Sequence, residues 1–177
     1  MQHRWDWMVV VILLLVLGAG EAQGRESSTT VAVNIQESIA VVSWPQEFLN
    51  LGGGLVPGGE VTSPELILTV KANSPWGIAI SCDLPNGRMQ EFDEVTGAYV
   101  PDGRILTNPL QWSVGKNGPW QALSSSGSSL AASQPPTGDA GQEVRFFLRY
   151  EASYSDLPVG PGRDYRMTLH YTAGLSY

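Results

Sequence analysis

Cysteine and histidine are nearly absent from this sequence of 177 residues. It holds one cysteine, Cys82, and two histidines, His3 and His170. A single cysteine excludes a disulfide within the chain, so the folded domain has to depend on its apolar core. One cysteine and two histidines, one of them in the N-terminal leader described below, are also too few for a zinc site built from these ligands.

Positively charged side chains are scarce as well. Ten lysines and arginines stand against 17 aspartates and glutamates, which gives a formal net charge of −7. Proteins bind nucleic acids and anionic lipids largely by placing cations against phosphates. The charge balance therefore predicts that nucleic acid is not a partner.

Long apolar runs are limited to one, MVVVILLLVLGA at residues 8–19. It follows the basic residues His3 and Arg4 and precedes small residues that end at Ala22, the pattern of a secretory signal peptide. A membrane-spanning helix needs roughly 20 apolar residues, so the run is short for a permanent anchor, which stays as the alternative. We predict a signal peptide at residues 1–22 and a secreted or cell-surface domain at residues 23–177, which meets the membrane only during export.

The remaining sequence lacks the helical spacing of apolar residues and alternates apolar with polar residues instead. Turn formers separate the alternating runs, among them Asn117-Gly118 and the stretch YVPDGRIL, where Gly103 is expected to supply a positive φ. We predict an all-β fold, a single antiparallel β-sandwich of immunoglobulin-like or jelly-roll-like shape. Of two long connections, residues 50–64 and 124–141, the second is low in complexity and is expected to be mobile. The expected apolar rows are Val31, Val33, Ile35, Ile39 and Val41; Leu66, Leu68, Val70 and Ala72; Trp76, Ile78, Ile80 and Cys82; Leu110, Trp112 and Val114; Val144, Phe146, Leu148, Tyr150, Ala152 and Tyr154; and Tyr165, Met167, Leu169 and Tyr171.

The stretch ANSPWGIAISCD raises the question of whether Cys82 is reactive. Cys82 continues the apolar row of Trp76, Ile78 and Ile80, and a free cysteine is often a small buried hydrophobic residue. A reactive thiol needs an electropositive and partly exposed setting, whereas the neighbour here is Asp83. We therefore predict a core cysteine, with pairing between molecules as the alternative.

Oxygen atoms of carboxylate and amide side chains are the only metal ligands that the sequence offers in number. The stretch DLPNGRMQEFDE gathers carboxylates and an amide, the ligands that calcium prefers. It lacks the spacing of a calcium-binding loop, so a solvated acidic loop is the competing interpretation. The calcium candidates are Asp83, Asn86, Glu91, Asp93 and Glu94.

Catalytic patterns are weak. His170 falls on the polar face of its expected strand, and no Gly-x-Ser-x-Gly stretch accompanies it. Two carboxylates could hydrolyse a glycan, and the acidic loop would have to supply them, alone or with Glu151 or Asp156, but nothing in the sequence fixes their separation. We predict that the protein is not an enzyme and needs no cofactor.

Tryptophans are the other candidates for ligand contacts. Trp76 and Trp112 alternate with aliphatic residues and are expected in the core. Trp44 precedes Pro45, and Trp120 follows a Gly-Pro pair, so both are expected at strand ends. Trp44 and Trp120 are therefore the candidate ligand-binding residues for glycans, although packing at the edge of the core is the alternative.

Two stretches resemble secreted bacterial β-sandwich proteins of the cell surface, namely the spore coat protein U type and fimbrial or WxL-like domains. One is VTSPELILTVKANSPWGIAIS and the other is the closing GRDYRMTLHYT. The spore coat and fimbrial types usually carry cysteine pairs, which this chain lacks. The resemblance implies a surface location and a structural role without catalysis.

Assembly by strand donation is a physical route to such a role. The run at residues 29–42 alternates directly behind the leader, and a segment of this kind can add a strand to a neighbour's sheet. The alternative is that it forms the first strand of its own sandwich. We predict an exported structural or adhesive surface protein with copies of itself or other surface proteins as partners, and a carbohydrate-binding module as the alternative.

Overall fold

The computed structural model describes residues 31–176, so the predicted signal peptide lies outside the described residues. The chain divides into two units, Met1–Ile35 and Gln36–Tyr177. In the first unit, the described residues 31–35 form no strand, and the side chains of Val31, Val33 and Ile35 are 81%, 80% and 77% exposed. No described helix is long and apolar enough to cross a membrane.

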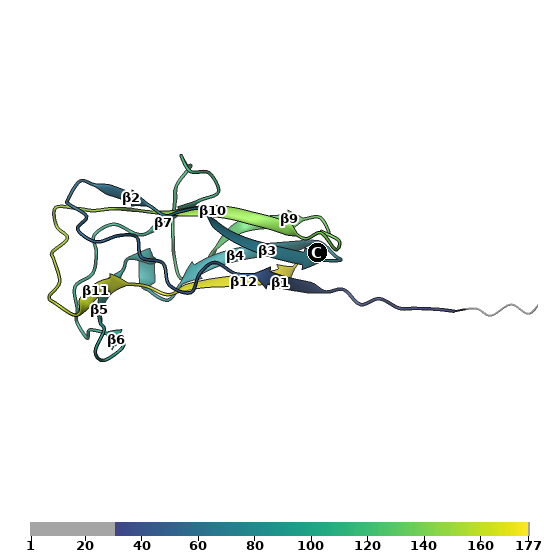
Figure 1. Cartoon of the computed structure of the whole chain (residues 1–177), viewed down its shortest axis with the longest axis horizontal. Helices are drawn as coiled ribbons and strands as arrows, with labels where there is room; N and C mark the ends of the chain where they lie inside the picture. Colours follow the sequence, from purple (N-terminus) through teal and green to yellow (C-terminus); the bar gives the residue numbers. More distant parts are fainter. Residues whose placement is uncertain (1–30, 177) are drawn as a thin grey trace, which may run out of the picture. The chain divides into compact units, whose positions relative to one another are not determined.

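The second unit consists of short strands joined by turns, with a single 3-10 turn at Pro85–Gly87 among its described residues (Figure 1). The strands are β1 (Ile39–Ser43), β2 (Glu60–Thr62), β3 (Leu66–Ala72), β4 (Trp76–Cys82), β5 (Gln90–Asp93), β6 (Ala98–Tyr99), β7 (Gln111–Ser113), β8 (Gln121–Ala122), β9 (Ser128–Gln134), β10 (Gln142–Glu151), β11 (Arg163–Arg166) and β12 (Leu169–Leu175).

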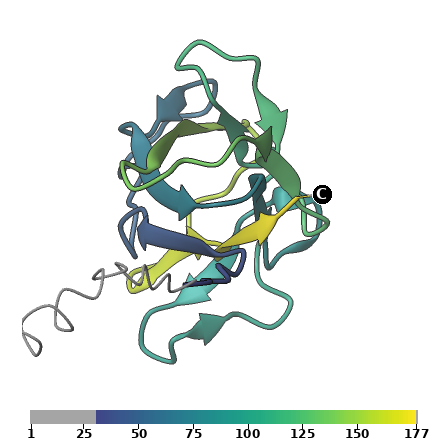
Figure 2. The ribbon, with the colours of Figure 1, turned by 90° about the vertical axis from the view of Figure 1, so that its right-hand side faces the viewer.

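Three antiparallel sheets are formed by these strands. The first runs β1-β3-β10-β7-β8, with β2 also paired to β10; the second runs β12-β4-β9; the third runs β11-β5-β6. The edge strands β1 and β12 lie side by side, as Figure 2 shows. All-β sandwich architecture is therefore confirmed.

The core lies between the first two sheets and consists of the alternating rows that the sequence predicts. Because successive residues of a strand point to opposite faces, each row places every second side chain inside. Burial of this apolar area is the main source of stability in a chain without disulfides. The buried members are Leu66, Leu68, Val70, Ala72, Trp76, Ile78, Ile80, Cys82, Leu110, Trp112, Val144, Phe146, Leu148, Tyr150 and Ala152.

The strands at the two ends of the chain are less buried than the sequence predicts. At the start, only Ile39–Ser43 of the long alternating run forms a strand, which pairs with β3 of its own chain. At the end, the closing run divides into β11 and β12, and its apolar row is only partly buried. Both β1 and β12 are edge strands, so each has a hydrogen-bonded ladder partner on one side only.

Three local predictions are wrong. Residues 124–141 are not a mere loop, because β9 lies within them and pairs with β4, placing Leu130 in the core. Asp102, not Gly103, adopts the positive φ in its turn; Gly103 is needed for space, since a Cβ there would lie 2.8 Å from the carbonyl oxygen of Val100. Val114 and Tyr154 lie beyond the ends of their strands and are exposed.

Ser63 joins two strands across a break in the ladder beside β10. It lies between β2 and β3, both of which pair with β10. Its backbone N–H donates to the Leu148 carbonyl at 2.8 Å, and the Leu148 N–H donates to the Ser63 hydroxyl at 3.0 Å. The hydroxyl donates in turn to the Pro64 carbonyl at 2.7 Å. A buried serine thus satisfies a backbone donor that the break would leave unpaired.

We expect the substitution Ser63→Ala to lower the free energy of unfolding by about 1–3 kcal/mol, the cost of a buried donor left without an acceptor. Urea denaturation followed by tryptophan fluorescence measures this difference. Ser43→Ala is the matched control, because the Ser43 hydroxyl bonds to Thr69 on an exposed surface. Equal losses in the two variants would contradict the bridging role of Ser63.

Candidate binding cavity at one end of the sandwich

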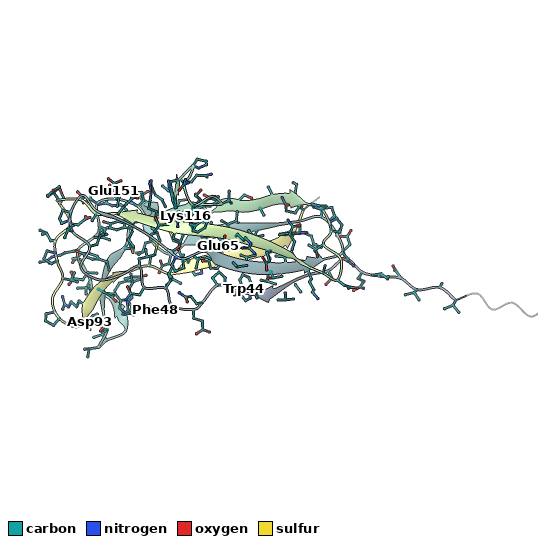
Figure 3. The ribbon with its side chains drawn as sticks, turned by 45° about the horizontal axis from the view of Figure 1, so that its top comes forward. Trp44, Phe48, Glu65, Asp93, Lys116 and Glu151 are labelled. Carbon is teal, nitrogen blue, oxygen red and sulfur yellow. The ribbon has the colours of Figure 1, made fainter. Side chains whose placement is uncertain are left out.

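A large cavity opens at the end of the sandwich that lies beyond the C-terminal end of β1. Its volume is about 1150 Å³. The segment of residues 44–57 forms one wall, and residues 156–159 together with β11 and the start of β12 form others. In Figure 3, Phe48 of the first wall lies between Trp44 and Asp93. The floor is made by core residues of both sequence halves: Leu66, Leu106, Leu110, Leu148 and Tyr150.

Residues 44–57 form a wall without regular structure because their sequence disfavours a strand. The segment contains no described strand, and it includes Gly52, Gly53 and Gly54 with prolines on either side. A Cβ added at any of these three glycines would meet no atom within 4 Å. Its larger apolar residues point partly outward, since Phe48 is 60% exposed and Val56 67% exposed.

Asp156 organises the wall at residues 153–159. Its carboxylate accepts hydrogen bonds from the Tyr150 hydroxyl and from the backbone N–H groups of Ser153 and Thr107, the latter two at 2.7 Å each. Burial alone would raise the pKa of Asp156, but these hydrogen bonds favour the charged form and lower its pKa overall. Burial of the Tyr150 hydroxyl, together with its hydrogen bond to Asp156, raises the pKa of Tyr150.

Two arginines of β11, a strand of the third sheet that also lines the cavity, pair with nearby carboxylates. Arg163 pairs with Glu91 at 2.8 Å, and this hydrogen bond lowers the pKa of the Glu91 carboxyl. Arg166 pairs with Asp164 at 2.6 Å and with Glu94 at 2.8 Å. The Arg166 guanidinium also lies 5.3 Å from the centre of the Phe48 ring, so β11 holds the wall of residues 44–57 by a cation–π contact.

Four of the five calcium candidates, the carboxylates, are engaged with donors of the protein itself. Asp83 accepts from the Tyr99 hydroxyl and from the Thr168 N–H, at 2.7 and 2.9 Å. The carboxylates of Glu91 and Glu94 pair with the arginines of β11 described above, while Asn86 is exposed in the 3-10 turn.

Asp93, the remaining candidate, accepts from the N–H groups of Val95 and Thr96, and its pKa is lowered mainly by the Thr96 bond. Across the described part of the chain, no group of three or more His, Cys, Asp or Glu residues could hold a metal ion. The structure therefore gives the calcium prediction no geometric support.

The two candidate tryptophans lie in different places. Trp44 is 51% exposed at the rim of the cavity, and its ring centre lies 6.2 Å from that of Tyr171. Trp120 does not line the cavity; the Arg149 guanidinium covers its ring at 4.6 Å. The two rings therefore do not form one platform.

Cys82 and His170 are not among the residues that line the cavity. Cys82 is a buried free cysteine, as predicted; its thiol donates to the Leu84 carbonyl at 3.2 Å, and burial, aided by Asp83, raises its pKa. His170 is exposed on β12. None of the described residues that line the cavity is a histidine or a cysteine.

Apolar contact is the chemistry that this cavity offers most. Its volume exceeds the range of about 300–1000 Å³ that is usual for small-molecule pockets, and its floor is built of buried aliphatic side chains. Sequence reasoning identified Trp44 but missed Phe48, Leu157 and the organising role of Asp156. Only the abundance of apolar residues among the glycines of residues 48–57 could have pointed to this wall.

Comparison with protein-family models and with curated proteins gives no match for the chain, so the interpretation of the cavity depends on its own geometry.

Proposed function

We propose that this protein is an exported, non-enzymatic structural or adhesive protein of the cell surface, which assembles with copies of itself by donating its N-terminal segment as a strand. The observation that carries the proposal is the exposure of three large aliphatic side chains at every second position, Val31, Val33 and Ile35. Exposed aliphatic side chains in a row favour association, because burying them removes apolar area from water.

The leader predicted at residues 1–22 supports the export component, since cleavage there leaves the alternating segment close to the new N-terminus. β1 supports the donation component, because the strand that the domain needs for its own first sheet begins only at Ile39. Residues 31–35 therefore take no part in the β1–β3 ladder of their own chain, and we propose that they pair with the sheet of another copy.

Light scattering coupled to size-exclusion chromatography tests this proposal. We expect the chain that begins at Gln23 to form oligomers whose mass rises with concentration. The same chain with Val31→Asp, Val33→Asp and Ile35→Asp should remain a monomer with an unchanged melting temperature, because the replaced side chains are exposed. A monomeric unsubstituted chain at all concentrations would contradict self-assembly.

A carbohydrate-binding module is the second candidate, and the observation in its favour is the half-exposed Trp44 beside Tyr171 at the cavity rim. Aromatic faces at a rim can stack on sugar rings. Binding to insoluble polysaccharide that is lost on Trp44→Ala and retained on Trp120→Ala would favour this function.

A further inference from the structure

We propose that the cavity at the end of the sandwich is the acceptor for residues 31–35 of a second copy, which would pair with the edge of β3 and β2 that has no ladder partner. The inference rests on the proposed function and adds to it the place where the donated strand binds. Three features carry it: an unpaired edge, an apolar lining that matches the alternating segment, and a chain path that rules out the cavity of the same molecule.

The unpaired edge is the first half of β3. The β1–β3 ladder runs from the pair Ile39–Ala72 to the pair Ser43–Thr69 and then ends, because β1 ends there. On its other side, β3 remains paired with β10 down to Leu66. Residues 66–68 therefore have a ladder partner on one side only. On the other side residues 44–46 lie near Leu66 and Ile67 but form no ladder with them. Unpaired strand edges are the sites at which further strands add.

The apolar lining lies beside this edge. Leu66 and Leu148 are buried in the cavity floor, while Phe48 and Leu157 are 60% and 56% exposed at its walls. A strand with apolar side chains at every second residue presents one face of that kind. Val31, Val33 and Ile35 would face the floor, and Ala32 and Asn34 would face solvent.

The path of the chain excludes a strand from the same molecule. The Gln36 carbonyl accepts from the Asn73 side chain at 2.8 Å, and Ile39 pairs with Ala72, so the domain begins beside the turn between β3 and β4. To return to the cavity, residues 31–35 would first have to run the full length of β1, which spans five residues. Running back along β1 takes five extended residues, about 17 Å, so all of residues 31–35 would be used before the chain reached the rim at Trp44.

Gln36, the residue at which the donor segment joins the second unit, and the cavity therefore lie at opposite ends of that unit. A contact between different surfaces of identical subunits is heterologous, and it produces rings or open filaments. Each copy would fill the cavity of the next and leave its own cavity for a third. Head-to-tail growth is the arrangement that this chain path favours.

Binding of a peptide tests the acceptor without requiring assembly. The probe is a fluorescein-labelled peptide of residues 31–37, VAVNIQE. The receptor is the chain from Gln23 that carries Val31→Asp, Val33→Asp and Ile35→Asp, whose own segment cannot compete. We expect saturable binding by fluorescence anisotropy, a rise in melting temperature with peptide, and no binding of the peptide with Val33→Asp.

Substitutions in the cavity wall then locate the peptide. Phe48→Asp and Leu157→Asp should each weaken peptide binding at least tenfold, because both side chains line the cavity and are exposed enough for the receptor to fold without them. Val95→Asp is the matched control, since Val95 is 91% exposed and lies outside the cavity lining. It should bind the peptide as the receptor does.

The outcomes separate this inference from the proposed function. One outcome is that the unsubstituted chain forms concentration-dependent oligomers while Phe48→Asp and Leu157→Asp leave peptide binding unchanged. This result would support self-assembly and would overturn the cavity as the acceptor. Monomers throughout and a peptide that does not bind would overturn both. Loss of binding in the two wall variants with retention in Val95→Asp would establish the cavity as the acceptor.

Discussion

Replacing Trp76 by alanine is expected to lower the free energy of unfolding by about 3–5 kcal/mol, the usual cost of removing a large buried aromatic side chain. The side chain is completely buried, and its indole N–H donates to the Pro135 carbonyl at 2.9 Å. The substitution therefore leaves a cavity in the core and a carbonyl without its donor. Stability of a domain is only about 5–15 kcal/mol, so this variant should be close to unfolding at room temperature.

Urea denaturation followed by circular dichroism measures the loss, and two further variants interpret it. Trp76→Phe keeps most of the apolar volume and removes the hydrogen bond, so the difference between the phenylalanine and alanine variants reports packing. Val95→Ala is the control at a position that is 91% exposed. A loss below about 1 kcal/mol in Trp76→Ala, the scale of an ordinary substitution, would contradict the central place of Trp76 in the core.

Replacing Asp156 by alanine is expected to give the second largest effect, roughly 3 kcal/mol at neutral pH. The carboxylate serves three donors, and a buried donor left without an acceptor costs about 1–3 kcal/mol. The Tyr150 hydroxyl contributes most of this loss because Tyr150 is buried, whereas the N–H of Thr107, an exposed residue, can turn to water. Tyr150→Phe should remove the hydroxyl together with its need for a partner, and should therefore cost less than Asp156→Ala.

The effect of Asp156→Ala should also depend on pH. The pKa of Asp156 is lowered in the folded protein, so the unfolded chain binds the proton more tightly and acid favours unfolding. The contribution of the carboxylate is complete above the unfolded pKa of about 3.9 and is lost as the pH falls through the folded pKa. We expect unfolding curves at pH 7, 5, 4 and 3 to show a difference between unsubstituted protein and Asp156→Ala that narrows below pH 4. A constant difference would mean that Asp156 acts without its charge.

Substitutions at Phe48 and Leu157 in the cavity wall should behave differently from those at Trp76 and Asp156, because they should affect assembly without affecting stability. Phe48 and Leu157 are exposed, so their replacement should change association and leave the core intact. Trp76 and Asp156 should change folding first. This contrast allows a loss of self-assembly to be attributed to the surface that is altered.

The sequence by itself determined the fold class and most of the core, because alternation is a local property. The rows that contain Leu68, Trp76 and Phe146 could be predicted from spacing alone, and burial of Cys82 followed from its place in one of them. Near strand ends, the same spacing wrongly predicts buried side chains at Val114 and Tyr154, because alternation does not indicate where a strand ends.

Only the tertiary structure decided which distant segments meet. The strand within residues 124–141 exists because β4 offers it a ladder, which no property of its own serine-rich sequence reveals. The acidic stretch is occupied by arginines of β11, about 70 residues later in the chain, so its charge pattern could not show whether it is free to bind a cation. The cavity likewise depends on residues 44–57 and residues 156–171 coming together around a shared floor. Local spacing fixes which side of a strand is apolar, whereas contacts between distant segments are fixed only when the whole chain packs.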